Sequence, residues 1–276
     1  MTRLRLRDGR DLAYTLHGPD EGAPLLWLHG APSGRGEGSF HAGAARQLGL
    51  RICAVDRPGM GESSRAPRPG LRSFAEDLAQ LTDALGWRRF VVAGASGGGP
   101  YALALAAVRG ERVVHALILA GAGQLAEDAR AAGWVDRLTG ALLRRAPVVV
   151  AAWLHAIRLV ARLGAGLPGT LGSAASVTAD ALAPGISGAL DDLRVLHAPW
   201  DVRLGTIAVP VTFVHGDRDA FVPFRHAEAL ARAVPGSRLV RRRGRGHVAV
   251  RLDLPGALHA SRLRRPAPPS AMVWPP

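Results

Sequence analysis

The segment 90–103, Phe-Val-Val-Ala-Gly-Ala-Ser-Gly-Gly-Gly-Pro-Tyr-Ala-Leu, constrains the fold more than any other part of this chain. An apolar, β-branched run stops at Gly94, Ser96 stands between small residues, and an alanine-rich helical pattern begins at once. A strand that turns this sharply into a helix leaves no room for side chains at Gly94 and Gly98, where the two elements crowd together. The segment therefore predicts a strand–turn–helix unit that presents the hydroxyl of Ser96 at the top of a sheet.

Two chemistries use a turn of this kind. In the first, Ser96 is a nucleophile, and the amide of Gly97 lies at a helix N-terminus, where unpaired donors and the helix dipole favour a developing oxyanion. In the second, residues 97–102 form a dinucleotide-binding turn, because they also satisfy the pattern G-x-G-x-x-A. That turn normally follows the first strand of its domain, with an acid about 20 residues later at the end of the second strand. Here three strand-like segments come first and Glu111 precedes the next strand, so the nucleophile is favoured.

The rest of the chain alternates between strand and helix patterns. Asp8-Gly9 predicts a hairpin between the first two strands, and the later, uniformly apolar runs are typical of a parallel sheet covered on both faces. Ser73 and Glu76 predict a capping box at the start of a helix. Pro255 either shortens the last helix or opens a second helical segment at its first turn. Strand-like runs occur at 4–7, 12–16, 25–28, 51–55, 90–93, 113–119, 211–214 and 238–241, and helical patterns at 38–47, 73–85, 98–108, 224–234 and 248–260. The pattern predicts an α/β fold with a doubly wound, mostly parallel, eight-stranded sheet.

The alternation breaks at residues 124–203, which show no strand pattern. This stretch mixes apolar helical runs with glycine-rich breaks, so we interpret it as a helical lid inserted into a core of residues 1–123 and 204–265. The last residues, 266–276, are rich in proline and lack periodicity, which predicts a disordered tail.

The run 148–160 within the predicted lid is strongly apolar. It is short for a bilayer span, and His155, Arg158 and Arg162 recur on one side of it. A helix that covers the pocket is therefore the favoured interpretation, and peripheral contact with a membrane is the less favoured one. No stable membrane insertion is expected.

The formal net charge of +13 does not by itself indicate a polyanionic partner. The chain contains neither lysine nor asparagine, so every Lys/Arg position is an arginine, as expected of a GC-rich coding sequence. The arginines are mostly scattered, and no nucleic-acid partner is expected. A single cysteine, Cys53, excludes an internal disulfide. With no apolar leader pattern at the N-terminus, the chain is expected to be cytoplasmic; its oligomeric state stays open.

Partners for Ser96 follow two later strands. A serine nucleophile needs a base to take its proton and an acid to orient that base. After the run 211–214 come His215, Asp217 and Asp219, and after the next strand comes His247. No group of His, Cys, Asp and Glu has the spacing of metal ligands, and no phosphate-binding loop is present, so neither a metal nor a cofactor is expected.

Four separated motifs together resemble the α/β-hydrolase fold superfamily, in its serine-triad, lid-bearing form. Residues 29–32, His-Gly-Ala-Pro, resemble the family's H-G-x-P oxyanion loop, and residues 56–63 resemble its D-x-x-G-x-G-x-S loop. Residues 94–98 are similar to its nucleophile elbow, and residues 216–219 with 246–247 to its acid and base loops. The chain order Ser, Asp, His is also the order of this superfamily. The resemblance extends from about residue 4 to residue 260.

The resemblance implies a role for each site residue. Ser96 would be the nucleophile, His247 the general base and Asp219 the orienting acid, since the family's acid stands just before an x-x-V-P stretch and Asp219 precedes Ala-Phe-Val-Pro. Asp217 is assigned to loop stabilisation instead. The oxyanion would be held by the backbone amides of Ala31 and Gly97. His29, His215 and Arg57 are expected to organise loops.

The expected activity is that of a serine hydrolase without a cofactor. It would cleave a carboxylic ester, lactone or amide through an acyl-enzyme on Ser96, and the tryptophans of the predicted lid favour a small, hydrophobic substrate. Proline iminopeptidase-like, carbon–carbon hydrolase or perhydrolase activity on the same triad stays open. A non-catalytic scaffold that binds a small molecule is the alternative from another class of protein.

Overall fold

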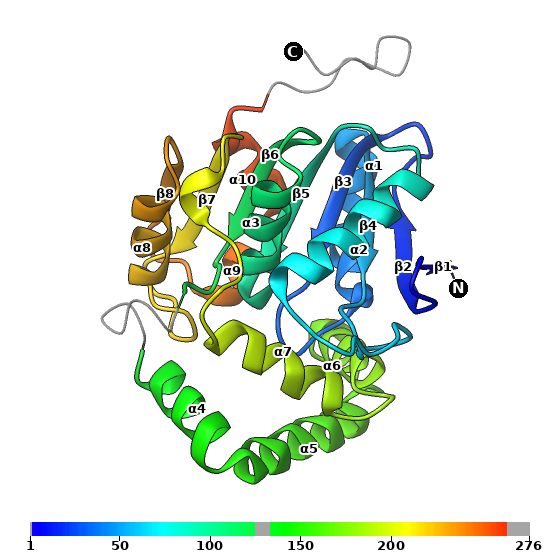
Figure 1. The fold of residues 1–276 in the computed structure, drawn as a ribbon, viewed down its shortest axis with the longest axis vertical. Coiled ribbons are helices and arrows are strands. Elements are labelled where there is room, and N and C mark those ends of the chain that lie inside the picture. Colours follow the sequence, from blue (N-terminus) through cyan, green and yellow to red (C-terminus); the bar gives the residue numbers. More distant parts are fainter. Residues whose placement is uncertain (1, 125–132, 264–276) are drawn as a thin grey trace.

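The computed structural model describes residues 2–124 and 133–263 (Figure 1). The predicted tail, residues 266–276, lies outside the described residues. One eight-stranded sheet runs through the molecule in the order β1-β2-β4-β3-β5-β6-β7-β8. Only β2 is antiparallel to its neighbours, and all other pairs are parallel. The strands are β1 (Thr2–Arg5), β2 (Asp11–His17), β3 (Ala23–Leu28), β4 (Leu50–Val55), β5 (Phe90–Ala95), β6 (Val113–Leu119), β7 (Val211–Gly216) and β8 (Arg238–Arg242).

Helices cover both faces of the sheet, which confirms the predicted doubly wound α/β fold. The central strands are apolar on both sides because both sides are buried: Leu26 and Val92 belong to one core layer, and Trp27 and Ala93 belong to the other. Helices α2 and α3 complete the first layer and α1 and α10 the second. The helices are α1 (Ala42–Leu48), α2 (Leu71–Ala84), α3 (Gly99–Val108), α4 (Trp134–Arg145), α5 (Pro147–Gly164), α6 (Gly169–Ala181), α7 (Ser187–His197), α8 (Arg225–Ala233), α9 (His247–Arg251) and α10 (Leu254–Ser261).

The turn between β5 and α3 is as tight as its glycines predict. A Cβ atom on Gly94 would lie 2.4 Å from the carbonyl oxygen of Gly98, and one on Gly98 would lie 2.2 Å from the carbonyl oxygen of Leu28. Backbone therefore packs on backbone where β3, β5 and the turn meet. Ser96 itself has a φ of +53°, in the left-handed region that non-glycine residues rarely adopt.

One predicted helix boundary is wrong, and the second helical segment that Pro255 offered as an alternative is confirmed. Helix α2 begins at Leu71 after Gly70, two residues before Ser73, so Ser73 and Glu76 form no capping box. A distant carboxylate, Asp201, accepts a hydrogen bond from the amide of Arg72 at 3.1 Å, so a tertiary contact replaces the predicted local cap. The pattern at 248–260 divides into α9 and α10, because Asp253 caps a new helix by accepting from the Gly256 amide.

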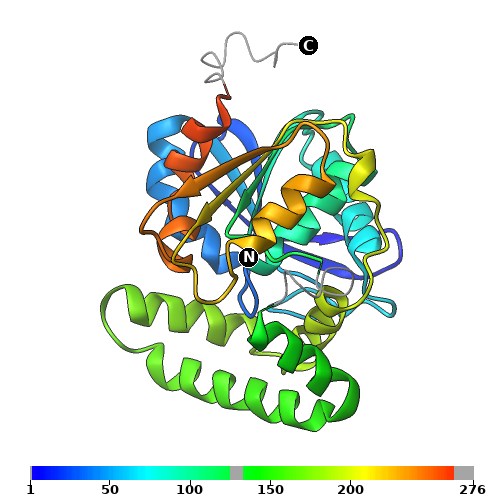
Figure 2. The same cartoon turned by 90° about the vertical axis from the view of Figure 1, so that its left-hand side faces the viewer.

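Between β6 and β7, the described residues form α4, α5, α6 and α7, which Figure 2 shows as a layer of green to yellow-green helices at one end of the molecule. They enclose a small core that includes Val150, Leu154, Leu182 and Ala189. By length and composition alone, α5 is the one helix of the described residues that is long and apolar enough to cross a membrane, and 17% of its 18-residue window is buried. The apolar helix is thus longer than the predicted run 148–160.

Buried histidines should make the fold sensitive to mild acid. Burial lowers the pKa of His41 and of His115 to about 4, and a charge on His17 adds to the effect at His41. The ordinary pKa is about 6.5, so between pH 6.5 and 4 the unfolded chain binds protons that the folded chain does not. The free energy of unfolding therefore falls as the pH falls. From pH 7 to pH 5 we expect a loss of about 2 kcal/mol for each histidine.

Urea denaturation at pH 7, 6 and 5 measures this loss. In the wild type, Nε2 of His115 lies 2.9 Å from the hydroxyl of Thr212. The variant His115→Gln keeps a polar partner for that hydroxyl but has no group that titrates. Its free energy of unfolding should therefore fall by about 2 kcal/mol less than that of the wild type over this pH range. The exposed His155→Gln change is the matched control and should leave the loss unchanged. An unaltered pH dependence in His115→Gln would contradict the assignment.

Candidate active site

Three side chains from distant parts of the sequence meet at the carboxyl edge of the sheet. Ser96 follows β5, Asp219 follows β7, and His247 begins α9 after β8. Nδ1 of His247 lies 2.6 Å from Oδ2 of Asp219, and Nε2 of His247 lies 3.1 Å from Oγ of Ser96. These distances fit an imidazole whose Nδ1–H donates to the carboxylate and whose Nε2 accepts from the serine hydroxyl. The structure thus joins the predicted serine, base and acid into one chain of hydrogen bonds.

Asp219 is held as an ionised carboxylate. Burial alone would raise its pKa, but hydrogen bonds from His215, from His247 and from the amide of Val222 lower the pKa below the usual value for aspartate. Its Oδ1 accepts from the amides of Phe221 at 2.9 Å and Val222 at 2.8 Å, which leaves Oδ2 for His247. The carboxylate is therefore fixed in place and charged at neutral pH.

His215 contacts the same carboxylate. Its Nε2 lies 2.8 Å from the carbonyl oxygen of Val222 and 3.4 Å from Oδ2 of Asp219, and its ring packs edge-on against Phe224. The sequence predicted a structural role for His215 but not this contact. Asp217, by contrast, points to the neighbouring loop, where it accepts from the amide of Gly244 at 2.7 Å.

The amides of Ala31 and Gly97 lie near one another beside Ser96. A Cβ atom on Gly97 would be 3.0 Å from Cβ and 3.5 Å from the amide nitrogen of Ala31. Outside the regular helices and strands of the described residues, no backbone carbonyl accepts a hydrogen bond from either amide. The same Cβ would lie 3.2 Å from a methyl carbon of Leu196 in α7, so an apolar side chain of the inserted helices borders this position. The backbone of Ala31 and an apolar side chain of α7 thus lie next to the residue that follows the serine.

A partly buried ion pair connects the loop of Ala31 to the helix of His247. Glu37 accepts from the Gly30 amide at 3.0 Å and from the indole of Trp27 at 3.2 Å, and the guanidinium of Arg251 donates to its other carboxylate oxygen. Arg251 is the last residue of α9, which starts with His247. Sequence reasoning missed both residues of the pair, because 214 positions separate them and neither belongs to a recognisable motif.

A second buried ion pair joins α7 to the core beneath the same loop. Arg57 donates to Asp192 at 2.8 Å and to the carbonyl oxygen of Gly30 at 2.9 Å, and the hydroxyl of Tyr101 donates to Asp192 at 2.7 Å. Burial, reinforced by the charge of Arg57, holds the pKa of His29 well below its usual value, so this histidine is neutral. His29 and Arg57 therefore touch the loop, not the serine.

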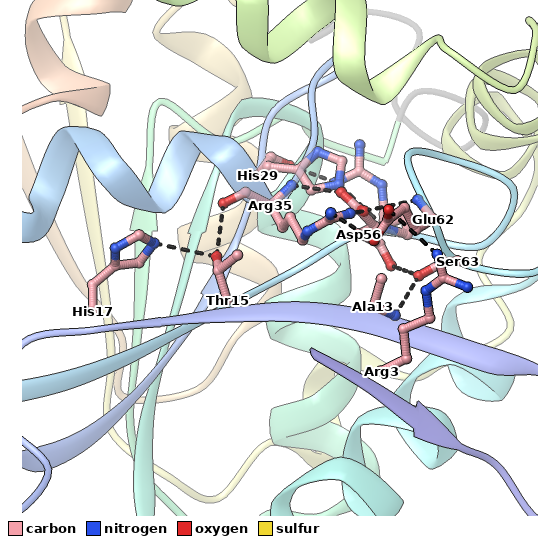
Figure 3. Close-up of polar contacts among 10 residues, drawn as sticks. Arg3, Ala13, Thr15, His17, His29, Arg35, Asp56, Glu62 and Ser63 are labelled. Carbon is pink, nitrogen blue, oxygen red and sulfur yellow. Dashed lines mark hydrogen bonds and ion pairs between the residues drawn. The ribbon is translucent and has the colours of Figure 1, made fainter. Parts of the chain in front are cut away.

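The polar side chains of the loop that begins at Asp56 form hydrogen bonds with neighbouring elements of the fold (Figure 3). Asp56 accepts from the amide and the guanidinium of Arg35, and Arg35 also pairs with Glu62. Ser63 donates to the carbonyl oxygen of Asp56 at 2.9 Å and accepts from the amide of Ala13 at 2.9 Å. Burial raises the pKa of Asp56 despite its contacts with Arg35. This motif therefore braces the loops around the site.

Within the described ranges, no group of three or more His, Cys, Asp or Glu side chains could hold a metal ion. Cys53 is buried in β4, and burial raises the pKa of its thiol, so it does not provide a second nucleophile. The groups that the structure brings together at this site are Ser96, His247, Asp219 and the backbone around Ala31 and Gly97.

Comparisons with known proteins bear on the family and the fold of this chain. A sequence model described as the alpha/beta hydrolase fold matches residues 23–253. An uncharacterised protein of Mycobacterium tuberculosis is 28% identical over 279 residues, covering 89% of this chain and 80% of that protein. A 2-hydroxymuconate semialdehyde hydrolase of Pseudomonas putida is 37% identical over 116 residues, covering 39% of this chain and 40% of that enzyme. The structure of an esterase from Exiguobacterium antarcticum superimposes with a TM-score of 0.73 at 22% identity, covering 89% and 92% of the two chains.

Proposed function

Because the chain belongs to the α/β-hydrolase fold family, we propose that it is a serine hydrolase that cleaves a carboxylic ester or a related acyl bond through an acyl-enzyme on Ser96. The observation that carries this proposal is the hydrogen-bonded chain from Asp219 through His247 to Ser96, with 2.6 Å and 3.1 Å between the paired atoms. The amides of Ala31 and Gly97 supply the donors that such a reaction needs beside the serine.

In the first step, Oγ of Ser96 attacks the carbonyl carbon while its proton passes to Nε2 of His247. The carbonyl oxygen becomes an oxyanion, which the amides of Ala31 and Gly97 stabilise by hydrogen bonds. His247, now an imidazolium paired with ionised Asp219, gives the proton to the leaving oxygen. The bond to the alcohol breaks and an ester on Ser96 remains.

In the second step, a water molecule attacks the acyl-enzyme. His247 takes a proton from the water, the same two amides hold the second oxyanion, and the proton then returns to Oγ as the acid leaves. Asp219 keeps Nδ1 of His247 protonated throughout, so that Nε2 faces the serine. No bound cofactor is required by these steps.

We further propose that the residues between β6 and β7, with helices α4 to α7, act as the lid over a small hydrophobic substrate. Leu196 of α7 borders the Gly97 amide, which supports an apolar group of the substrate beside the reacting carbonyl. The ion pair of Arg57 with Asp192 ties this part of the lid to the core.

Covalent labelling with a fluorophosphonate, combined with a panel of substrates, tests the proposed function. Intact mass spectrometry should show one added phosphonate per folded chain, and p-nitrophenyl esters should be hydrolysed faster than amides. The rate should rise from acetate to longer acyl chains if the substrate group is hydrophobic. Folded protein that neither labels nor turns over any ester or lactone would instead support a non-catalytic scaffold, and a flat dependence on acyl length would overturn the hydrophobic substrate.

Substituting Asp219 distinguishes it from its neighbour Asp217. Asp219→Asn is expected to lower kcat on the order of 10⁴-fold, because an amide at this position no longer selects the productive tautomer of His247. Asp217→Asn retains the size of the side chain and an acceptor for the Gly244 amide, so its kcat should stay within a few-fold of the wild type. Steady-state kinetics on p-nitrophenyl butyrate measure both. The opposite pattern would assign the acid to Asp217.

A further inference from the structure

The exposed surface of α4, α5 and the start of α6 is unusually apolar for a protein in water. Among the described residues, eleven of the fourteen large apolar side chains that are exposed lie here, with 43–79% of their surface accessible. Figure 1 shows α4 and α5 along the edge of the molecule that is farthest from the sheet. This outer face comprises Trp134, Val135, Leu138, Val148, Val149, Trp153, Leu159, Val160, Leu163, Leu167 and Leu171.

Helix α5 carries two apolar stripes rather than one. The inner stripe contains Val150, Leu154 and Ala161, which are buried against the other inserted helices. The second stripe lies on the outer face, where residues 149, 153, 156, 160 and 163 repeat at intervals of four and three, as helical neighbours do. Within the part of the chain that the structure describes, the outer stripe is open to solvent. An exposed apolar patch made of eleven large side chains marks an interaction surface.

Basic side chains border the outer face, and α5 contains no aspartate or glutamate. Arg144 and Arg145 end α4, and His155 and Arg162 are exposed on α5. Apolar residues with tryptophan on one side and arginine beside them are the composition of helices that lie at the surface of an anionic membrane. Long arginine side chains can reach lipid phosphates while their carbons stay in contact with apolar surface.

Charge argues against a second copy of this chain as the occupant. Two outer faces placed together would bring Arg144, Arg145 and Arg162 of each copy against an α5 that offers no carboxylate. A helix that crosses the bilayer fits no better, because the inner stripe is already packed against α6 and α7 and would have to be exposed to lipid.

We propose that the outer face of α4 and α5 docks on an anionic lipid bilayer, with α5 parallel to the membrane plane. Trp134 and Trp153 enter the headgroup region, and Arg144, Arg145 and Arg162 contact lipid phosphates. This docking is independent of the reaction proposed above, and it can be measured without turnover.

Co-sedimentation with vesicles tests the docking. At 0.1 M NaCl the wild type should bind vesicles of phosphatidylcholine and phosphatidylglycerol in a 3:1 ratio, and bind pure phosphatidylcholine far more weakly. Trp153→Glu with Val160→Glu should lower the partition coefficient at least tenfold. The matched control, Gln47→Glu with Ala84→Glu, adds two carboxylates at exposed helix positions elsewhere and should bind as the wild type does. Circular dichroism verifies that each variant is folded.

A second pair of variants measures how much the arginines contribute to binding of anionic vesicles. Arg144→Gln with Arg145→Gln should lower binding to the anionic vesicles about 30-fold, since each arginine near such a surface contributes about 1 kcal/mol. Arg7→Gln with Arg46→Gln removes two exposed arginines from other elements and should have little effect.

Four results would overturn the proposal. The first is wild-type protein that stays in the supernatant with anionic vesicles, and the second is equal binding by a variant and its control. The third is a dimer in light scattering that Trp153→Glu with Val160→Glu converts to monomer. The fourth is bound protein that alkaline carbonate fails to release, because that would indicate a helix that crosses the bilayer.

Discussion

Replacing Ser96 by alanine is expected to abolish fluorophosphonate labelling and to lower kcat for p-nitrophenyl butyrate on the order of 10⁶-fold. The reason is that, among the described residues, Oγ of Ser96 is the nucleophile that lies within hydrogen-bond distance of the proposed base, 3.1 Å from Nε2 of His247. Alanine removes only that oxygen. The backbone of residue 96, with its φ of +53°, has already accepted a side chain, so the fold should be retained.

A double variant makes this prediction sharper. His247→Ala should reduce kcat about as much as Ser96→Ala, and the two changes together should reduce it little further, because the groups act as one unit. Additive losses would mean that the two residues act in separate steps. Ser173→Ala, at an exposed serine of α6, is the control and should leave labelling and kcat unchanged. Labelling that persists in Ser96→Ala would place the nucleophile elsewhere.

Removing one partner of the ion pair between Arg57 and Asp192 is expected to lower the free energy of unfolding by about 3–5 kcal/mol. The side chains of Arg57 and Asp192 are only 1% and 3% exposed, so the charge left behind in Arg57→Met would be buried without its partner. The carbonyl oxygen of Gly30 would also lose a donor. Urea denaturation at pH 7 measures the loss, which is a large part of the stability of an ordinary domain.

Two further variants distinguish the cost of leaving a buried charge without its partner from the cost of losing an arginine side chain. Arg57→Met with Asp192→Leu removes both charges and should recover most of the lost free energy of unfolding. The kcat of this double variant should be lower than that of the wild type, because the loop of Ala31 is no longer braced. Arg109→Met breaks the ion pair with Glu76, whose side chains are 39% and 42% exposed, and should change stability by about 1 kcal/mol or less. A double variant as unstable as the single one would show that the arginine acts through packing.

The strands and the candidate site were predictable because their signals are local. Short apolar or alternating runs mark the eight strands, and each candidate site residue lies in the loop after one of them or begins the next helix. Since parallel strands end at one edge of the sheet, residues in loops after β5, β7 and β8 are brought together by topology alone. Topology thus predicts that Ser96, His247 and the loop of Asp217 and Asp219 meet, whereas the choice of Asp219 came from the resemblance to the loops of the α/β-hydrolase family.

The supports of the site were not predictable, because they depend on contacts between residues far apart in sequence. Glu37 and Arg251 are separated by 214 positions, and Arg57 and Asp192 by 135. Asp201 replaced the local cap expected at Ser73 for the same reason. A buried carboxylate and a buried guanidinium carry no mark in the sequence that distinguishes them from the many exposed ones. Only tertiary structure pairs them.

The distance along the chain between Ser96 and His247, 151 residues, has a consequence for synthesis of the protein. At roughly 5–20 residues per second, the ribosome adds His247 roughly 8–30 s after Ser96. During that interval the nascent chain contains the serine but not the imidazole of His247, and β7 and β8 are added only in the last part of it. Under the proposed mechanism, hydrolytic activity begins only after His247 has been added, and a chain truncated ahead of residue 247 would be inert.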